Sequence, residues 1–258
     1  MAASTAFYDD LAPTYDRLYP DWYAAVREQA DALDTALKRV VGKGPHRVLD
    51  CAVGIGTQGL CLGLLGHHVV GTDLSAGALR RARAEADRLG LKVPLAVADM
   101  RQLPLAGGAF DAVVCVDALA HLSSVREAAR ALREMARVVR PDGVVLVSIR
   151  DYEAARRDRP PGTLPQVNRT GLNETVAFQV WDWHSDGCSY DLTHFVLSSD
   201  VHGWAVTTRR TTLRAFQRHE LLEAATEAGL VDVEWRTSAD SGFFQPAVVG
   251  RVPRGARM

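Results

Sequence analysis

Short apolar runs alternate with longer amphipathic segments between residues 46 and 151. The runs are almost continuously apolar, which is typical of parallel strands buried on both faces of a sheet. The segments between them repeat their apolar positions at helical spacing. The expected strands are 46–54, 67–75, 93–100, 109–119 and 144–151, and the expected helices are 21–41, 56–66, 75–90 and 123–139. This alternation predicts an α/β fold built on a doubly wound, mostly parallel sheet.

The pattern changes after Asp151, where the helical segments stop. Residues 156–170 are rich in arginine and proline and are expected to form a loop. Three strand-like runs follow with short polar turns between them, which predicts an antiparallel meander. They are 174–184, 188–198 and 203–214, and a helix at 218–230 and strands at 231–237 and 245–252 are expected to follow. We therefore expect one domain over 1–258, with an arm and first helix (1–41), a core (42–150), an antiparallel insertion or lid (151–216) and a closing part (217–258).

Charge and apolar content exclude some classes of protein. The net charge is −1, and charged residues make up 24% of the 258 positions. Proteins held mainly on nucleic acid or on an anionic membrane need a basic excess, so neither partner is expected. No apolar run reaches the ~18 residues that a membrane span needs, and the first ten residues lack the features of a signal peptide.

The cysteines indicate a reducing compartment. Cys51, Cys61, Cys115 and Cys188 show no metal-ligand spacing. Free thiols in apolar stretches usually pack as small apolar groups. We therefore expect a cytoplasmic protein without a metal site.

The end of the first expected strand carries a candidate ligand loop. Asp50, Ala52, Gly54 and Gly56 follow one another at alternate positions. Glycines between a strand and a helix let a ligand approach the backbone closely. A dinucleotide loop needs a third glycine where Thr57 stands, and a pyrophosphate there would face the Asp50 carboxylate. The loop therefore favours a ligand that carries an ammonium or sulfonium group.

The next two strands extend this site. Asp73 ends the second expected strand, at the spacing from the loop where an acidic residue binds ribose hydroxyls. A ribose-bearing ligand with a cationic tail and no pyrophosphate describes S-adenosylmethionine. Asp99 and Met100, after the third strand, are expected beside the adenine, with Asp99 accepting from its exocyclic amine.

These motifs resemble, in order and spacing, those of class I S-adenosylmethionine-dependent methyltransferases. The resemblance covers 46–150 and includes Phe110–His121 and Val139–Gly143. It implies a Rossmann-like methyltransferase fold and S-adenosylhomocysteine as product. The implied cofactor contacts are Asp50, Ala52, Gly54, Gly56, Asp73, Leu74, Asp99, Met100 and Asp117. A Rossmann-like sheet whose glycines serve only packing is the structural alternative.

A narrower resemblance links the chain to glycine N-methyltransferases and related small-molecule N-methyltransferases. The stretch 48–58, the Ala-His-Leu at 120–122 and the segment 149–152 carry it. It implies that Arg150, with Tyr152 beside it, grips a substrate carboxylate, which a guanidinium binds bidentately.

The same resemblance assigns roles to the N-terminal arm and to His121. Tyr19 and Arg27 are expected to close over the methionine end of the cofactor, with Arg27 taking its carboxylate. Tyr8 is expected at the substrate, and Tyr15 and His121 at the reacting groups. Aromatic packing of the arm, and a helix-start position for His121, are the alternatives.

The chain departs from the glycine enzymes just before His121. Residues 117–119 read Asp-Ala-Leu, one residue shorter than the family's asparagine-containing stretch. The departure argues against glycine itself as acceptor, and Asp117 could instead hold a substrate ammonium or another polar group.

The function expected from these residues is N-methylation of a small amine, such as a precursor in bacterial secondary metabolism. O- or C-methylation with His121 as base is one alternative, and a non-catalytic S-adenosylmethionine-binding protein is another. A nicotinamide oxidoreductase is disfavoured by the missing third glycine. A salt bridge to Asp151 or Glu153 is the alternative role for Arg150. The tryptophans of the meander, Trp181, Trp183 and Trp204, are expected to form its core. The meander could also support a homo-oligomer.

Overall fold

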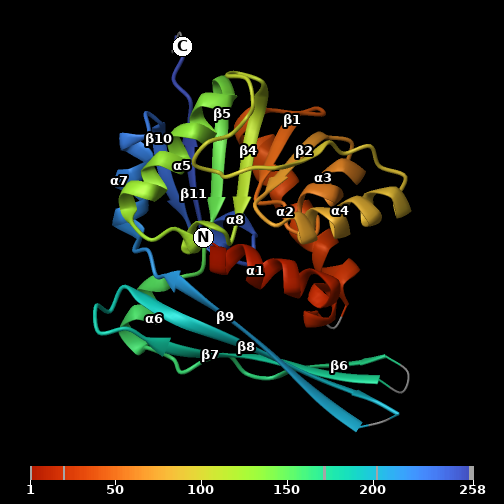
Figure 1. Cartoon of the computed structure of the whole chain (residues 1–258). Helices are drawn as coiled ribbons and strands as arrows, with labels where there is room; N and C mark the ends of the chain where they lie inside the picture. The colour runs from red at the N-terminus through yellow and green to blue at the C-terminus, as the bar shows by residue number, and fades with distance from the viewer. Residues whose placement is uncertain (1, 20, 171–172, 202, 256–258) are drawn as a thin grey trace.

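Two β-sheets form the framework of the molecule (Figure 1). The computed structural model describes residues 2–19, 21–170, 173–201 and 203–255. The larger sheet has seven strands in the order β10-β11-β5-β4-β1-β2-β3. They are β1 Arg47–Cys51, β2 His68–Asp73, β3 Leu95–Val97, β4 Phe110–Val116, β5 Val139–Ser148, β10 Val231–Arg236 and β11 Ala247–Arg251. The first five pair in parallel, whereas β11 is antiparallel to both β5 and β10, which confirms the predicted doubly wound, mostly parallel sheet.

Helices cover both faces of this sheet (Figure 1). α5 (Val125–Val138) and α7 (Arg218–Glu227) pack together on one face, where Leu132 and Leu221 are buried. α2 (Trp22–Val41), α3 (Gly59–Leu64) and α4 (Ala76–Arg88) lie on the other, with a core that includes Leu37 and Leu60. The expected serine caps are present, since the hydroxyls of Ser75 and Ser124 accept from the backbone of α4 and α5.

The smaller sheet is antiparallel, with strands in the order β6-β7-β8-β9. These are β6 Gln166–Thr170, β7 Asn173–Trp183, β8 Ser189–Asp200 and β9 Gly203–Arg214. Its inner face buries Trp181, Tyr190 and Leu213 against the rest of the core. Trp183 is half-buried, but Trp204 is 55% exposed, so the expected tryptophan core holds only for the first two.

The N-terminal arm lies between the two sheets (Figure 1). It consists of α1 (Ala2–Leu11) and the 3₁₀ segment η1 (Ala12–Leu18). α1 packs on β9 and on α4, and Arg209 of β9 donates to the backbone oxygen of Asp10 at 2.7 Å. The arm therefore joins the antiparallel sheet to the core.

Three local expectations need correction. The 156–170 region, expected to be a loop, contains the end of α6 (Tyr152–Asp158) and all of β6, which is stabilised by its pairing with β7. Strand β5, expected from residue 144, begins at Val139 and includes Asp142, which has a left-handed φ of 62°. The helix expected from residue 56 begins at Gly59, because the residues before it form the ligand loop. The short elements η2 (Leu119–His121) and α8 (Ser238–Ser241) complete the chain.

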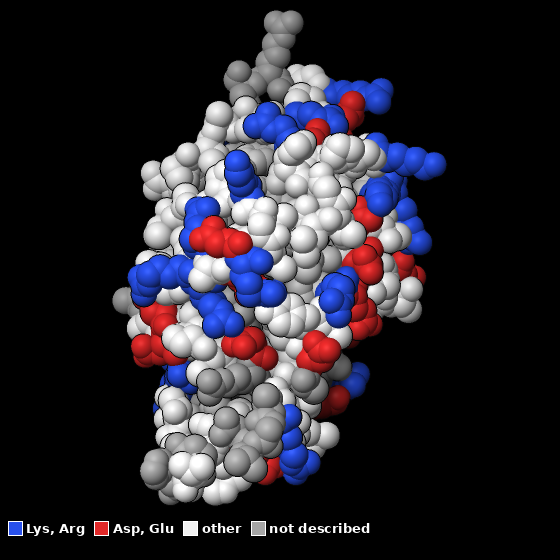
Figure 2. Space-filling model, turned by 90° about the vertical axis from the view of Figure 1, so that its right-hand side faces the viewer, with Lys and Arg blue, Asp and Glu red and all other residues white. Residues whose placement is uncertain are grey.

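Surface charges of both signs are mixed on the face drawn in Figure 2. Basic and acidic side chains alternate there over short distances, so this face has no single-signed stripe of the kind that nucleic acid binding needs. Within the described residues, no helix is long and apolar enough to cross a membrane.

Candidate cofactor and acceptor site

A deep cavity opens at the carboxyl ends of the parallel strands, where doubly wound sheets bind ligands. Its empty volume, mouth included, is about 1130 Å³. The lining comes from segments within 5–19, 51–58, 72–78, 98–100 and 116–121, together with Phe244. Concave sites at this edge of a doubly wound sheet are the usual place for a small ligand.

The loop after β1 forms the floor of the cavity. Ala52 has a φ of 87° and Gly54 a φ of 55°, both in the left-handed region. The backbone amides of Ala52 and Val53 both donate to the Thr72 oxygen, at 2.8 and 2.9 Å. This conformation turns the backbone of 52–55 toward the cavity, as predicted for a ligand loop, although alanine occupies a position that favours glycine.

Asp73 fixes that loop against the end of β2. Its Oδ2 accepts from the Gly54 amide and its Oδ1 from the Ser75 amide, each at 2.8 Å. The Asp73 side chain and Leu74 both line the cavity. Burial raises the pKa of Asp73, while the backbone amides act in the opposite direction. The carboxylate is therefore held rigidly with lone pairs still available to a ligand hydroxyl.

Asp50 lies behind the loop rather than on the cavity wall. It is 1% exposed. Burial, and next the nearby Asp73, raise the pKa of Asp50 to about 7. A cationic ligand in the cavity would favour the ionised carboxylate. The charge of Asp50 thus suits a sulfonium-bearing cofactor, although Asp50 is not part of the cavity lining.

The charges of the lining disfavour a pyrophosphate ligand. Two carboxylates, Asp73 and Asp117, face the cavity, and among the described residues no lysine or arginine lines it. Carboxylates repel a diphosphate, whereas adenosine with a cationic tail carries a charge that they attract. The residues present therefore fit S-adenosylmethionine.

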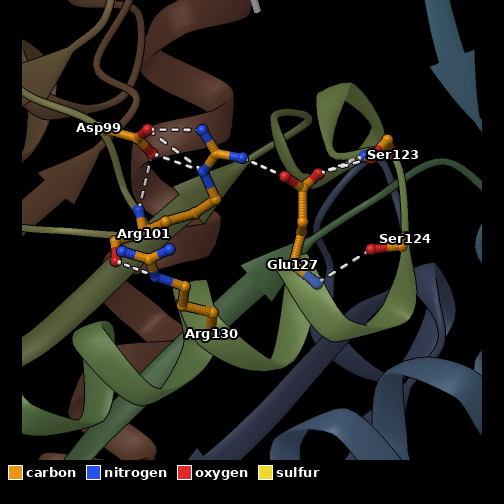
Figure 3. A network of polar contacts seen from close by, with 6 residues as sticks. All are labelled: Asp99, Arg101, Ser123, Ser124, Glu127 and Arg130. Carbon is orange, nitrogen blue, oxygen red and sulfur yellow. Dashed lines mark hydrogen bonds and ion pairs between the residues drawn. The ribbon is translucent and has the colours of Figure 1, made fainter.

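The adenine end differs from the sequence expectation. Ala98 and Met100 line the cavity, but Asp99 does not. Arg101 holds both oxygens of Asp99 through its side chain and backbone amide, with Nη2 at 2.7 Å from Oδ2 (Figure 3). Because these bonds occupy the carboxylate, we do not assign the adenine amine to Asp99.

Arg101 also joins two walls of the cavity (Figure 3). Its Nη1 pairs with Glu127, whose other oxygen accepts from the amide and hydroxyl of Ser123 at 2.8 Å. Ser123 follows the short segment that carries His121. The network therefore connects the segment of Met100 to the segment of His121, and both residues line the cavity.

Three tyrosines of the arm line the cavity: Tyr8, Tyr15 and Tyr19. The arm is anchored by Asp9, whose Oδ1 accepts from the Ser75 hydroxyl at 2.6 Å and from the Gly77 amide at 2.7 Å. Arg27, in contrast, is exposed on α2 and is absent from the lining. The structure thus brings the three tyrosines to the cavity but does not bring Arg27 there.

Asp117 and His121 follow β4 and line the cavity. His121 Nε2 is 3.0 Å from the Tyr8 hydroxyl. Burial lowers the pKa of His121 to about 4, so this imidazole is a weak base. Burial, and next Asp117, raise the pKa of Tyr8 well above its usual value, so Tyr8 stays a neutral phenol.

Arg150 and Tyr152 are not part of the cavity lining. The Arg150 guanidinium sits 4.5 Å from the centre of the Trp181 ring, and its Nη1 has no hydrogen-bond partner among the described residues. The salt bridge considered for Arg150 is not observed; Asp151 instead caps the Glu153 amide. The Tyr152 hydroxyl is 3.1 Å from that of Tyr190, and both side chains are buried.

Phe244 and Thr5 line the cavity without having been singled out from the sequence. Phe244 reaches it from the segment between β10 and β11, far along the chain from the other lining residues. No motif surrounds it, so only the tertiary fold could have revealed it.

Comparison with known proteins agrees with this geometry. Residues 48–143, which hold the loop, Asp73 and Asp117, match the family model described as a methyltransferase domain. This stretch is about a third of the chain, and over it the sequence is similar to a methyltransferase domain. A demethylmenaquinone methyltransferase of Thermus thermophilus is 35% identical over 144 residues, covering 54% of this chain and 62% of that protein.

A glycine/sarcosine N-methyltransferase of Parasynechococcus marenigrum is 32% identical over 149 residues, covering 57% of this chain and 51% of that protein. The chain thus spans about half to three fifths of the length of these relatives. The crystal structure of the sugar N-methyltransferase KedS8 from Streptoalloteichus has the same fold, with a TM-score of 0.71 at 24% identity over 88% of each chain. Together these matches support S-adenosylmethionine as the ligand of the cavity.

Proposed function

We propose that this protein is an S-adenosylmethionine-dependent methyltransferase that methylates an amine nitrogen of a small molecule. The observation that carries the choice of nitrogen is the Asp117 carboxylate, which lines the cavity together with the side chains of Tyr8, Tyr15 and Tyr19. A carboxylate and the electron-rich faces of aromatic rings attract an ammonium. The same groups repel a phenolate or carboxylate acceptor.

S-adenosylmethionine, when bound, supplies a methyl group activated by a sulfonium. Asp73 would accept from the ribose hydroxyls, and Ala98 and Met100 would pack against the adenine. Tyr8, Tyr15 and Tyr19 would close the cavity and exclude water. Orientation supplies most of the rate gain in such a displacement, which suits a rigid cavity whose only imidazole is a weak base.

Acceptor identity is tested by a screen with methyl-labelled S-adenosylmethionine over aliphatic amines, including amino sugars and amino acids. Each amine is paired with the matching alcohol, and products are identified by mass spectrometry. We expect label on nitrogen for at least one amine and none for its alcohol. Transfer to alcohols or carbon acids alone would replace N-methylation by the O- or C-methylation alternative, and tight cofactor binding without turnover would indicate a binding protein.

The cofactor assignment has its own test in Asp73→Ala. Losing a charge-assisted hydrogen bond costs about 1.5–3 kcal/mol, so S-adenosylhomocysteine should bind roughly tenfold to a hundredfold more weakly. Calorimetry gives the affinity and circular dichroism checks the fold. The exposed Asp87 of α4 provides the control Asp87→Ala, and equal affinities for the two variants would remove Asp73 from the site.

A further inference from the structure

The backbone turns abruptly where β4 enters the cavity. Asp117 has a φ of 53° directly after the strand, and its amide donates to the Ser148 oxygen at 2.9 Å. A left-handed residue other than glycine costs of order 1–3 kcal/mol and tends to occur at functional sites. Here the turn directs a carboxylate into the cavity instead of packing an apolar side chain.

Few groups compensate the charge of Asp117. Arg150 lies near enough to favour the ionised carboxylate, and Gln245 donates a hydrogen bond to it. The other titratable neighbours that face it are neutral phenols, namely Tyr8, Tyr15, Tyr19, Tyr152 and Tyr190. The Arg150 guanidinium lies over the Trp181 ring and also interacts with Tyr190. The Asp117 carboxylate therefore keeps lone pairs that are accessible from the cavity.

We propose that Asp117 takes a proton from the ammonium group of the molecule that is methylated. This inference rests on the proposed N-methylation. One N–H bond of the ammonium breaks and an O–H bond forms on Asp117, which leaves a neutral amine with its lone pair free. The lone pair then forms the N–C bond as the C–S bond breaks and its electrons stay on sulfur. The methylated ammonium product carries the positive charge, and the proton on Asp117 leaves to solvent as products depart.

The surroundings of the site bring the pKa of the Asp117 carboxyl closer to the pKa of the ammonium group that it deprotonates. Loss of hydration raises the pKa of Asp117, whereas Arg150 and Gln245 act in the opposite direction. The net shift is upward, so this carboxylate is a stronger base than an ordinary aspartate, although its surface is open to the cavity. A nearby sulfonium and a desolvated cavity both lower the pKa of an ammonium. His121 is the other candidate base, but its Nε2 is engaged by Tyr8 and its pKa is about 4. Asp117 is therefore the group better placed to take the proton.

The first test needs no knowledge of the acceptor. Sinefungin carries an amine-bearing carbon in place of the methylated sulfonium, and S-adenosylhomocysteine carries only the thioether. The wild-type protein should bind sinefungin about tenfold more tightly than S-adenosylhomocysteine at pH 7, as expected for one charge-assisted hydrogen bond.

Asp117→Asn should abolish that preference and leave the affinity for S-adenosylhomocysteine within about threefold of wild type. Asparagine tolerates the left-handed backbone, so the variant keeps the turn. Asp87→Asn is the surface control. An asparagine variant that keeps the sinefungin preference overturns the proposal. If the asparagine variant fails to fold, Asp117→Glu is the substitute, because it keeps the negative charge and should still bind sinefungin more tightly than S-adenosylhomocysteine. A glutamate variant without this preference would also overturn the proposal.

The second test separates proton transfer from positioning, using an amine identified by the screen. In Asp117→Asn the amine must lose its proton in solution, so kcat/KM should fall about a hundredfold at pH 7 and approach the wild-type value near the pKa of the amine. If kcat/KM of the asparagine variant falls by the same factor at every pH, Asp117 only positions the amine. That result would contradict the proton transfer but not the proposed N-methylation. A screen without any methylated amine would contradict the proposed function as well, whatever sinefungin shows.

Discussion

Single residues in left-handed backbone shape the two ends of the cavity. Ala52 in the floor and Asp117 at the acceptor end both have a positive φ. Glycine would fit the first position without strain, whereas the second needs a side chain. A glycine substitution should therefore relieve strain at Ala52, whereas at Asp117 it would remove a side chain that the site needs.

Ala52→Gly should stabilise the protein by about 1 kcal/mol, because it removes the strain of alanine at a φ of 87°. Urea unfolding measures the free energy. Ala118→Gly is the matched control, since Ala118 has a φ of −112° and glycine should destabilise there. Destabilisation by both variants would mean that the conformation of the loop is not the one described.

Asp50 connects stability to pH. Its folded pKa, about 7, lies above the ordinary value of 3.8, so the folded protein favours the protonated form. The contribution to stability is complete below about pH 4 and is lost as pH rises through 7.

Asp50→Asn should therefore unfold at a higher temperature than wild type at pH 8, with the difference shrinking toward pH 4. The same variant should bind S-adenosylmethionine more weakly at pH 8, because the negative charge beneath the sulfonium is gone. Scanning calorimetry at several pH values and titration calorimetry at pH 8 measure the two effects. A stability difference that is constant with pH would place the pKa of Asp50 near its usual value.

At the scale of elements, the arm depends on one side chain. Asp9 connects α1 to the first turn of α4 through Ser75 and Gly77, and Ser75 also donates to Asp73. α1 therefore docks directly beside the residue expected to bind the ribose.

Asp9→Ala should weaken S-adenosylhomocysteine binding by about tenfold, the effect of losing one strong hydrogen bond, and should speed proteolysis within 8–20. Asp10→Ala is the control, because the neighbouring aspartate uses only its backbone oxygen in the contact with Arg209. Cleavage of both variants at the wild-type rate, with and without ligand, would show that the arm is a fixed structural element.

Regular elements could be predicted from the sequence, and tertiary contacts could not. Strands β1, β2 and β4 and helices α2, α4 and α5 were expected because buried strands are continuously apolar and amphipathic helices repeat every 3.6 residues. β6 was missed because an arginine- and proline-rich segment forms a strand only when β7 is there to pair with it. For the site, the motif residues at strand ends came together. Arg27 does not reach the cavity, because its position depends on how α2 packs on the core. Asp99 pairs with Arg101, two residues further on, and the motif at the strand end does not indicate this local contact.

At the scale of the whole molecule, the outer face of the antiparallel sheet is uncovered in Figure 1. Phe178 and Phe195 stack there at 5.0 Å, and Val167, Trp204 and Val206 are exposed. Strands β7, β8 and β9 have 11–12 residues and β6 has five, so this face has an area of about 600 Å². A standard interface buries about 800 Å² per partner.

We therefore expect two copies to pair through this face. Size-exclusion chromatography with light scattering should give twice the monomer mass. Val206→Glu should shift the protein to monomer, whereas Val231→Glu, at an exposed valine of β10, should not. A wild-type protein that stays monomeric at micromolar concentration would contradict the expectation.

The position of α1 also bears on the sequence of events in a catalytic cycle. Neighbouring residues of that helix serve the two ends of the cavity: Asp9 holds the segment beside Asp73, and Tyr8 contacts His121. A helix that docks on the cofactor side thereby completes the acceptor side. The nucleoside should enter first and leave last. Initial-rate kinetics would then show S-adenosylhomocysteine competing with S-adenosylmethionine but not with the amine, an inhibition pattern set by two adjacent side chains.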